Sequence, residues 1–511
     1  MTTGAAAEIG AGTGWRRAVL GLGAGVAAAL VVVLTLGLPT GGTFGVEDNG
    51  DGYRLYCGAG LTPSTVDRLG AWKGGVVTDF AVGTPTCWST PSSAGLVVRA
   101  AMLGHQGSLA LGSVAWWYAA LVGLVVAAAA WAASAAGMWR AAVLVVPVAP
   151  LALGPFTRFF LSTYGEPAGL LGALAVACGI AALLVTRPEH RRARTVAVLV
   201  AALGGGIAAT AKVAYVPVLV VALVACAMVA VGRRRPRRLI GPAIAVVTVL
   251  AVAVPVGAAV AFQDSVYEGA NVHDLVFTLA LTELGPGATA DLGLPPEAAA
   301  VTGTGYFNGP PHPSAPWWTR AIRDRPDATR TAAYETLARH PAALFRAVGV
   351  GLQATTRADL PYLASGPADT SRFSPPGGDP GWSGARQPDL RAVLDGTRRP
   401  PWLPTALVLL AVLAAGSTVA WRRRAPAAAR WCLAAGLGAV TALGLVTTAV
   451  LGDGYFEVFK HVWLAAYLLV VTGICLLVAL AAGIGPVGRR FVGRPHRSAQ
   501  RGSPPSTPAG S

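Results

Sequence analysis

Charged residues are scarce in this chain of 511 amino acids. Only 13% of the residues are Asp, Glu, Lys or Arg, about half the fraction of a soluble domain, and 54% are apolar. The mean hydropathy is +0.55. So few charges cannot supply the polar surface that several globular domains need in water, and the many Val, Leu and Ala residues exclude a disordered or collagen-like chain. The composition therefore predicts an integral membrane protein.

The motifs of soluble enzymes are also missing. The sequence has no phosphate-binding G-x-x-x-x-G-K-[ST] loop, no H-E-x-x-H zinc motif, no nucleophile elbow and no G-x-G-x-x-G after a strand. Energy or activated substrate must then come from the membrane, a gradient or another subunit. The net charge of +16 comes mostly from short arginine clusters between apolar runs. That pattern anchors loops at the cytoplasmic face, so we expect no nucleic-acid partner.

Ten segments are apolar enough to cross the hydrocarbon core of a membrane, which takes about 20 residues. They are residues 18–38, 108–136, 141–156, 167–186, 195–211, 213–232, 239–262, 403–421, 431–451 and 462–483. The first has too long an apolar core, and no small-residue cleavage site, for a cleaved signal peptide. The sequence predicts an all-α polytopic membrane protein with about ten transmembrane helices and two structured outer loops.

The arginine clusters predict the orientation of these spans. With ten spans, all the clusters fall on one side, which the positive-inside rule assigns to the cytoplasm together with both termini. The predicted map is a cytoplasmic N-terminus 1–17, a first transmembrane helix 18–38, a first outer loop 39–107, transmembrane helices two to seven within 108–262, a large outer loop 263–402, transmembrane helices eight to ten within 403–483 and a basic disordered cytoplasmic tail 484–511.

The two long outer loops carry features of their own. Cys57 and Cys87 share the first, exported loop, so we predict a disulfide between them, worth about 3 kcal/mol by loop entropy. The other cysteines lie in predicted spans and should behave as small apolar residues: Cys178, Cys226, Cys432 and Cys475. In the second loop, the apolar positions of 327–356 have a helical spacing. This predicts a helix along the outer leaflet or packed on other loops.

Ionisable residues gather at the outer ends of several spans. Directly after the first span come Glu47, Asp48, Asp51 and Arg54, with glycines that permit a sharp bend. A solvated turn is the alternative interpretation of this segment. The last outer junction, at 452–461, gathers two carboxylates, a lysine and a histidine, for which a local ion pair is the alternative.

Two further junctions bring charge to the same predicted face. Arg158 and Tyr164 precede the fourth span, and Glu166 stands at its start, where it could also be only a helix-dipole partner. Lys212 lies between the fifth and sixth spans and is one of three lysines in the chain. A lysine there indicates a functional cation or a snorkelling anchor. Together the four junctions predict one polar pocket on the outer face.

These residues together resemble those of polytopic bacterial glycosyltransferases of the GT-C type, specifically actinobacterial hexose transferases of cell-envelope glycan assembly. The resemblance covers the chain from end to end and depends on the order and loop placement of the motifs. The matching residues are 49–54, 160–167, Lys212 with Tyr215 and Pro217, Asp453 with Gly454, Glu457, Lys460 and His461, and Asn271 with Asp274 and Phe277. The first stretch departs from the bare acidic pair that many GT-C enzymes use.

The resemblance implies a donor sugar on a polyprenyl phosphate in the outer leaflet and an acceptor hydroxyl on a glycan, lipid or protein. A carboxylate would take the acceptor proton, with Asp51 as first candidate, Asp48 second and Glu47 third. The candidates for holding the leaving phosphate are Arg54, Lys212, Lys460, His461 and Arg158. The candidates for binding substrate are Tyr164, Glu166, Asp453 and Glu457.

Several alternatives stay open at this point. A single displacement would invert the anomeric configuration, whereas a double displacement would need Asp453 or Glu457 as nucleophile. Glu47, Asp48 and Asp51 could also bind Mg²⁺ or Mn²⁺. A lipid-linked sugar flippase is the competing function, but transporters usually carry their charges within the spans. A non-catalytic subunit of an envelope complex would explain the long loops but not the charged junctions.

Overall fold

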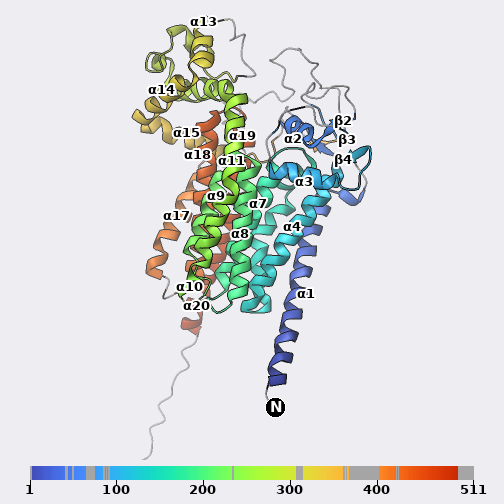
Figure 1. Cartoon of the computed structure of the whole chain (residues 1–511). Helices are drawn as coiled ribbons and strands as arrows, with labels where there is room; N and C mark the ends of the chain where they lie inside the picture. The colour runs from blue at the N-terminus through green and yellow to red at the C-terminus, as the bar shows by residue number, and fades with distance from the viewer. Residues whose placement is uncertain are drawn as a thin grey trace, which may run out of the picture.

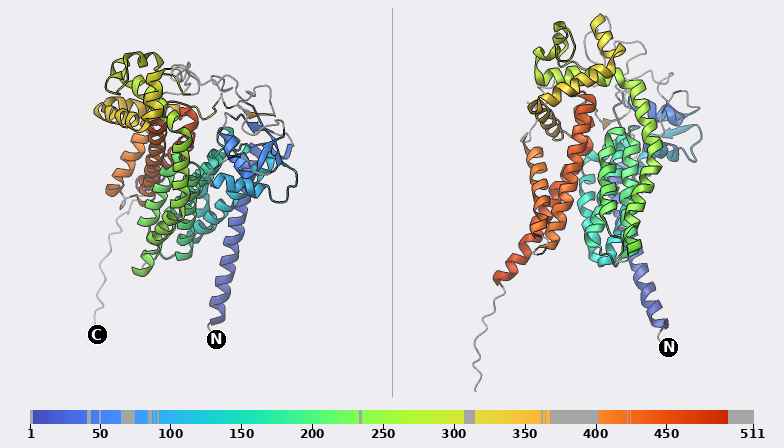
Figure 2. Two further views of the ribbon diagram at one scale, coloured as in Figure 1. Left: turned by 45° about the horizontal axis from the view of Figure 1, so that its top comes forward. Right: turned by 60° about the vertical axis from the view of Figure 1, so that its left-hand side comes forward.

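The computed structural model is a bundle of long helices that carries two outer segments at one end (Figure 1). The structure describes residues 3–40, 44–48, 51–64, 75–83, 87, 89, 92–232, 235–306, 315–360, 363, 365–367, 402–421, 423 and 425–492. The first described helix begins, and the last described helix ends, at the opposite end of the bundle from the outer segments (Figure 2).

Seven helical segments in these described ranges are long and apolar enough to cross a membrane. They are Gly14–Thr35, Leu111–Ala136, Glu166–Val185, Arg191–Ala211, Ile240–Leu284, Pro426–Asp453 and Trp463–Gly483. Met138–Ala152 and Gly154–Leu161, bent by 84°, form an eighth if the pair counts as one span, and Val213–Met228 and Leu403–Thr418 are shorter apolar helices. The all-α polytopic fold is confirmed, and three of the ten predicted spans are short or broken.

Glycines let neighbouring spans approach closely. α7 (Glu166–Val185) packs on α8 (Arg191–Ala211), and a Cβ atom on Gly172 would lie 2.5 Å from the carbonyl oxygen of Gly204. α1 (Thr3–Thr35) packs on α4 (Leu111–Ala133), where a Cβ on Gly25 would lie 2.4 Å from the carbonyl oxygen of Gly123. Because lipid chains give no hydrophobic drive between helices, such close backbone packing holds the bundle together.

Prolines break the predicted third span. The segment runs through η3 (Met138–Leu144), α5 (Val145–Val148), η4 (Ala149–Ala152), α6 (Gly154–Thr157) and η5 (Arg158–Leu161). Proline has no backbone N–H, so nearby carbonyls lose their helical partners. Two side chains of α20 (Trp463–Val492) supply new ones. Trp463 Nε1 donates to the carbonyl of Pro155 at 2.9 Å, and the Tyr467 hydroxyl donates to that of Pro147 at 2.8 Å.

The first outer segment folds as a small α/β unit. β2 (Leu61–Pro63), β3 (Asp79–Val82) and β4 (Ser108–Ala110) form an antiparallel sheet beside α2 (Gly52–Ala59) and α3 (Ser93–Ala101) (Figure 1). The predicted disulfide is present, with 2.07 Å between the sulfur atoms of Cys57 and Cys87. β1 (Gly45–Val46) pairs with β5 (Ser365–Gly366) of the large outer segment, so the two outer segments are hydrogen-bonded to each other.

The second outer segment begins as a continuation of a span. The helix expected to end at residue 262 continues as α11 (Ile240–Asp274), the π-helix η7 (Leu275–Ala280) and α12 (Leu281–Leu284). The segment predicted as one helix over 327–356 is two helices, α14 (Pro326–Arg339) and α15 (Pro341–Ala354). Pro341 separates them, because its ring keeps the preceding residue out of the helical conformation.

The ends of the chain are more helical than predicted. α1 already begins at Thr3, inside the segment expected to be a cytoplasmic N-terminus. α20 continues from the last span to Val492, into the predicted disordered tail, whose residues 493–511 lie outside the described ranges. α20 packs with α17 (Leu403–Trp421) and α18 (Pro426–Asp453) into a C-terminal group beside α7, α8 and α9 (Val216–Met228) (Figure 2).

Candidate functional site

The four outer junctions meet in one place. Lys460 Nζ lies 2.6 Å from Asp51 Oδ2, although 409 positions separate the two residues in the sequence. The same ammonium forms an ion pair with Glu457 and lies 5.7 Å from the centre of the Tyr164 ring. The junctions that contain Asp51, Tyr164 and Lys460 therefore share one polar cluster, as the ten-span count predicted.

A tight turn places Lys460 in this cluster. α18 ends at Asp453, and the chain turns through Gly454 into α19 (Val458–His461). Gly454 has a φ of 58°, and a Cβ there would lie 2.3 Å from the carbonyl oxygen of Asp274, so only glycine fits. Glu457 has a φ of 46°, which is uncommon for a residue with a side chain. Its ion pair with Lys460 helps to hold this conformation.

Lys460 is a buried cation. Its side chain is 0% exposed, which by itself would lower its pKa, but Asp51 and Glu457 outweigh burial and hold the pKa well above its usual value. This enclosed ammonium is shared by two carboxylates, and its contacts fit the positioning of Asp51. The role of Lys460 in phosphate binding stays a prediction.

Asp51 is the open carboxylate of the first junction. Its side chain is 37% exposed, and it accepts hydrogen bonds from Lys460 and from the Tyr267 hydroxyl, the latter at 3.2 Å. Glu47 and Asp48 are buried. Asp48 accepts from the backbone N–H of Gly52 at 3.2 Å, where α2 begins. Of the three predicted bases, Asp51 is the one that a substrate can reach.

Tyr164, Glu166 and Lys212 connect the middle spans to the cluster. The Tyr164 hydroxyl donates to the backbone carbonyl of Glu47 at 2.8 Å, so the junction before the fourth span is joined to the junction after the first span. Lys212 Nζ donates to Glu166 Oε1 at 3.1 Å. The Lys212 side chain is 29% exposed, whereas Glu166 is buried. Lys212 thus keeps part of its ammonium-bearing side chain accessible, as a phosphate-binding role requires.

His461 and Asp453 form a second pair beside Lys460. His461 Nδ1 lies 3.1 Å from Asp453 Oδ2. Burial and the positive charges of Lys212 and Lys460 hold the pKa of His461 well below its usual value. The imidazole is therefore neutral at pH 7, and with its proton on Nδ1 it donates to Asp453.

The two predicted arginines have different positions. Arg158 is half-buried, and its Nη2 donates to the backbone carbonyl of Leu360 at 3.3 Å, while its guanidinium lies 5.3 Å from the Phe159 ring. It therefore helps to hold the large outer segment against the bundle. Arg54 belongs to α2, but its side chain lies outside the described part of the structure.

The carboxylates of the first junction do not converge as metal ligands. Among the residues that the structure describes, no three Asp, Glu, His or Cys side chains are grouped so that they could hold a metal ion. Asp51 faces Lys460 and Tyr267, whereas Asp48 faces the start of α2. The donor set predicted for Mg²⁺ or Mn²⁺, Glu47 with Asp48 and Asp51, does not fit such a site in this arrangement.

The structure adds residues that the sequence did not single out for a role. Tyr267 of α11 holds Asp51, and its position in a predicted loop concealed it. Asp274 is buried beneath Gly454 and accepts from the backbone N–H of Tyr306 at 2.7 Å. The Tyr455 hydroxyl donates to Glu283 at 2.6 Å. A prediction that continued the seventh span as a helix beyond residue 262 would have placed Tyr267 and Asp274 near the outer junctions.

The fold and the cluster define a polytopic helical membrane protein with a polar site at one end of its bundle. Residues 15–370 match the model of one membrane protein family, described as the YfdI N-terminal transmembrane domain, and the chain belongs to this family. No curated protein and no solved structure matches the chain.

Proposed function

We propose that the protein is a membrane glycosyltransferase of the GT-C type, which moves a hexose from a polyprenyl-phosphate donor to an extracytoplasmic glycan, lipid or protein. The observation that carries the proposal is the accessible carboxylate of Asp51, fixed by Lys460 and Tyr267 at the polar end of the bundle. This end is the outer face if the arginine clusters at the opposite end are cytoplasmic. A donor carried by lipid suits a site that lies at a membrane boundary.

The proposed reaction is a single displacement at the anomeric carbon. Asp51 accepts the proton of the acceptor hydroxyl as that oxygen bonds to the anomeric carbon. The bond from this carbon to the phosphate oxygen breaks, and polyprenyl phosphate leaves with both electrons. Transfer in one step inverts the anomeric configuration.

The other side chains of the site fall into two groups. Lys212 borders the cluster with part of its side chain accessible, and it would stabilise the charge that develops on the leaving phosphate. The neutral His461 donates from Nδ1 to Asp453 and would orient that carboxylate. Lys460 and Glu457 are enclosed, and they fix the position of the Asp51 carboxylate. Since Tyr164 and Glu166 are also buried, they support the walls of the site instead of contacting the sugar.

The test is sugar transfer in detergent by purified protein, with synthetic polyprenyl-phosphate hexoses as donors and a deacylated envelope glycan extract as acceptor. Asp51→Asn keeps the shape of the side chain but removes the base, so we expect transfer to fall about 100-fold or more. The matched control is Asp327→Asn on α14, because the Asp327 side chain is 85% exposed. It should retain the wild-type rate.

The detergent assay also separates transfer from lipid flipping, because micelles have no two leaflets between which a lipid could move. A flippase would show no transfer in micelles. Full activity of Asp51→Asn would remove Asp51 from the mechanism, and absence of transfer by the wild-type protein with every donor tried would count against the proposed activity. In cells, deletion of the gene should leave polyprenyl-phosphate hexose accumulated beside a truncated glycan.

A further inference from the structure

A second polar cavity lies at the other end of the bundle, far from Asp51. It is lined by residues of the α4–η3 connection, the turn between α7 and α8, and the start of α18. Its polar side chains are cationic or neutral: Arg140, Arg187, Arg430 and His190. No acidic residue lines it, and among the described residues these three arginines form no ion pair. Glu189 is near but exposed.

Two of the arginines are held in place by protein contacts that leave donors unused. Arg430 Nη1 donates to the backbone carbonyl of Leu184 at 2.8 Å, at the end of α7. The Arg140 guanidinium stacks on the Trp139 ring at 3.8 Å from its centre. A guanidinium has five N–H donors, and its planar fork matches the oxygens of a phosphate. The cavity therefore presents ordered cations with unused hydrogen-bonding capacity.

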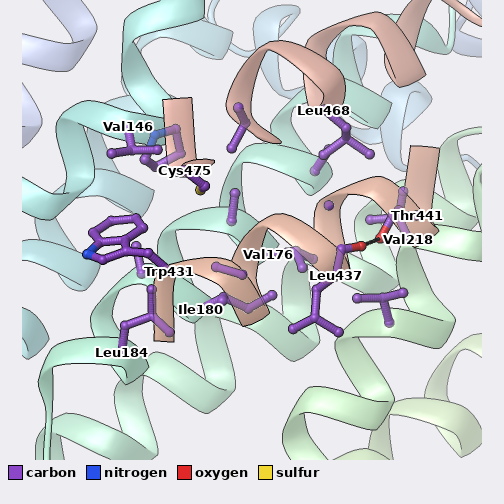
Figure 3. A pocket seen from close by; sticks show the side chains of 18 residues that line it. Val146, Val176, Ile180, Leu184, Val218, Trp431, Leu437, Thr441, Leu468 and Cys475 are labelled. Carbon is purple, nitrogen blue, oxygen red and sulfur yellow. Dashed lines mark hydrogen bonds between the residues drawn. The ribbon is translucent and has the colours of Figure 1, made fainter. Parts of the chain in front are cut away.

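An apolar crevice lies beside this cavity, and Figure 3 shows the side chains that line the crevice. Leu184 and Trp431 line both spaces. From there the crevice follows one face of α7 and one face of α18, with Val176, Leu437 and Cys475 among its walls. Its lining on α7 runs from Ala173 to Leu184, a rise of about 16 Å at 1.5 Å per residue.

The two spaces differ in chemistry. The cationic cavity contains about 810 Å³ of space outside protein atoms, and the apolar crevice about 540 Å³, each counted with the part that is open to its surroundings. A molecule that fills both must have an anionic head and an apolar chain.

We propose that these two adjoining spaces together form a binding site for an anionic phospholipid of the leaflet on the side of the chain termini. The phosphate contacts Arg140, Arg187 and Arg430, and an acyl chain lies between α7 and α18. Charge complementarity selects the head group, because arginines near the membrane surface attract anionic lipids. The bound lipid would fill the seam between the C-terminal helix group and the rest of the bundle.

The experiment is native mass spectrometry of the full-length protein in detergent, titrated with dioleoylphosphatidylglycerol. Dioleoylphosphatidylcholine has the same chains and no net charge, and we expect it to bind at least tenfold more weakly. Arg140→Gln with Arg430→Gln should weaken phosphatidylglycerol binding about tenfold or more. The matched control is Arg192→Gln with Arg238→Gln, two exposed arginines at the same end that do not line the cavity. It should change the affinity less than twofold.

A second variant tests the chain-binding half of the site. Ala434→Phe fills the crevice on α18 without touching the arginines, and it should weaken phosphatidylglycerol binding severalfold. Arg140→Gln alone is the fallback if the double variant does not fold, because Arg430 also holds the end of α7. Equal binding of the two lipids would overturn the proposal. The proposal would also be overturned if phosphatidylglycerol binding were unchanged in the double arginine variant and in Arg140→Gln alone. Displacement of phosphatidylglycerol by millimolar inorganic phosphate would overturn it as well.

Discussion

At the scale of single residues, Lys460 holds the carboxylates of the polar cluster together. Its buried ammonium joins Asp51, from the start of the chain, to Glu457, from its own turn. A buried charge without a partner is very unfavourable, whereas a paired one can be nearly neutral in its effect on stability. The cluster is therefore sensitive to which partner is removed, and stability and activity should respond differently.

Lys460→Met should lower both stability and transfer. It leaves the buried Glu457 carboxylate without its cation, which costs on the order of 3 kcal/mol, and it removes one of the contacts that position Asp51. The double variant Lys460→Met with Glu457→Gln should regain part of the stability but none of the activity. Thermal unfolding in detergent and the transfer assay measure the two effects. Recovery of activity in the double variant would contradict a positioning role.

His461 should make the protein less stable in mild acid. Its folded pKa lies well below the unfolded value of about 6.5, so below pH 6.5 the unfolded state binds a proton that the folded state does not. The contribution of His461 to stability therefore falls as the pH falls from about 7 to 5, by at most about 1.4 kcal/mol per pH unit for one proton. His461→Gln removes this contribution, so its unfolding temperature should fall less over this range. Parallel pH dependence of the two proteins would refute the assignment.

The sequence identified most residues of the cluster but not their roles. The junction residues Asp51, Lys212 and Lys460 were recognisable because charge is rare in this chain. Which of them is enclosed depends on how the junctions pack, and a sequence pattern does not contain that information. Tyr267 carries no charge and lies 216 positions from Asp51, so only the structure shows that the two meet.

At the scale of elements, the contact of α7 with α8 depends on glycine. Gly172 and Gly204 face each other, and a Cβ on either would lie within 2.6 Å of the other's carbonyl oxygen. The two helices carry Glu166 and Lys212 to the site, so their spacing affects the geometry of this pair. Small residues at such contacts are common in membrane bundles.

Gly172→Leu should separate α7 from α8. The larger side chain overpacks the contact, which typically costs 1–3 kcal/mol and here requires backbone movement. We expect a lower unfolding temperature and weaker donor binding. Gly23→Leu in α1 is the matched control, because nothing lies within 4 Å of its added Cβ, and it should leave both quantities unchanged. Equal effects of the two substitutions would show that the α7–α8 contact has no special role.

Hydropathy predicted the positions of the spans better than their ends. The apolar run of the seventh span stops near Asp264, yet α11 continues through Asp264 and Glu268 to Asp274. Helical hydrogen bonding does not require apolar residues once the helix leaves the lipid, so the polar segment stays helical. The bend in the third span likewise follows from its prolines and from contacts with α20, where Trp463 lies 308 positions from its partner Pro155.

At the scale of the whole molecule, the polar cluster and the cationic cavity lie at opposite ends of one bundle. The first contains the carboxylates that we assign to transfer, and the second contains the arginines that the positive-inside rule places in the cytoplasm. The apolar surfaces of the spans lie between them.

Thiol labelling should locate these two ends on opposite sides of the membrane. Glu335→Cys lies on exposed α14, and Arg423→Cys lies between α17 and α18. A membrane-impermeant maleimide should label Glu335→Cys in intact cells and Arg423→Cys only after permeabilisation. The native background is low, because Cys57 and Cys87 form a disulfide and the other four cysteines are buried. The reverse labelling pattern would place the site in the cytoplasm and exclude an outward-facing transferase.

The pairing of Asp51 with Lys460 also constrains the order of events during synthesis. Asp51 leaves the ribosome early, but its cationic partner follows 409 residues later, just before the final span. A nascent chain therefore has no complete site while its earlier helices are being inserted. Under the proposed transfer function, the polypeptide would stay inert toward lipid-linked sugars until translation reaches the last span.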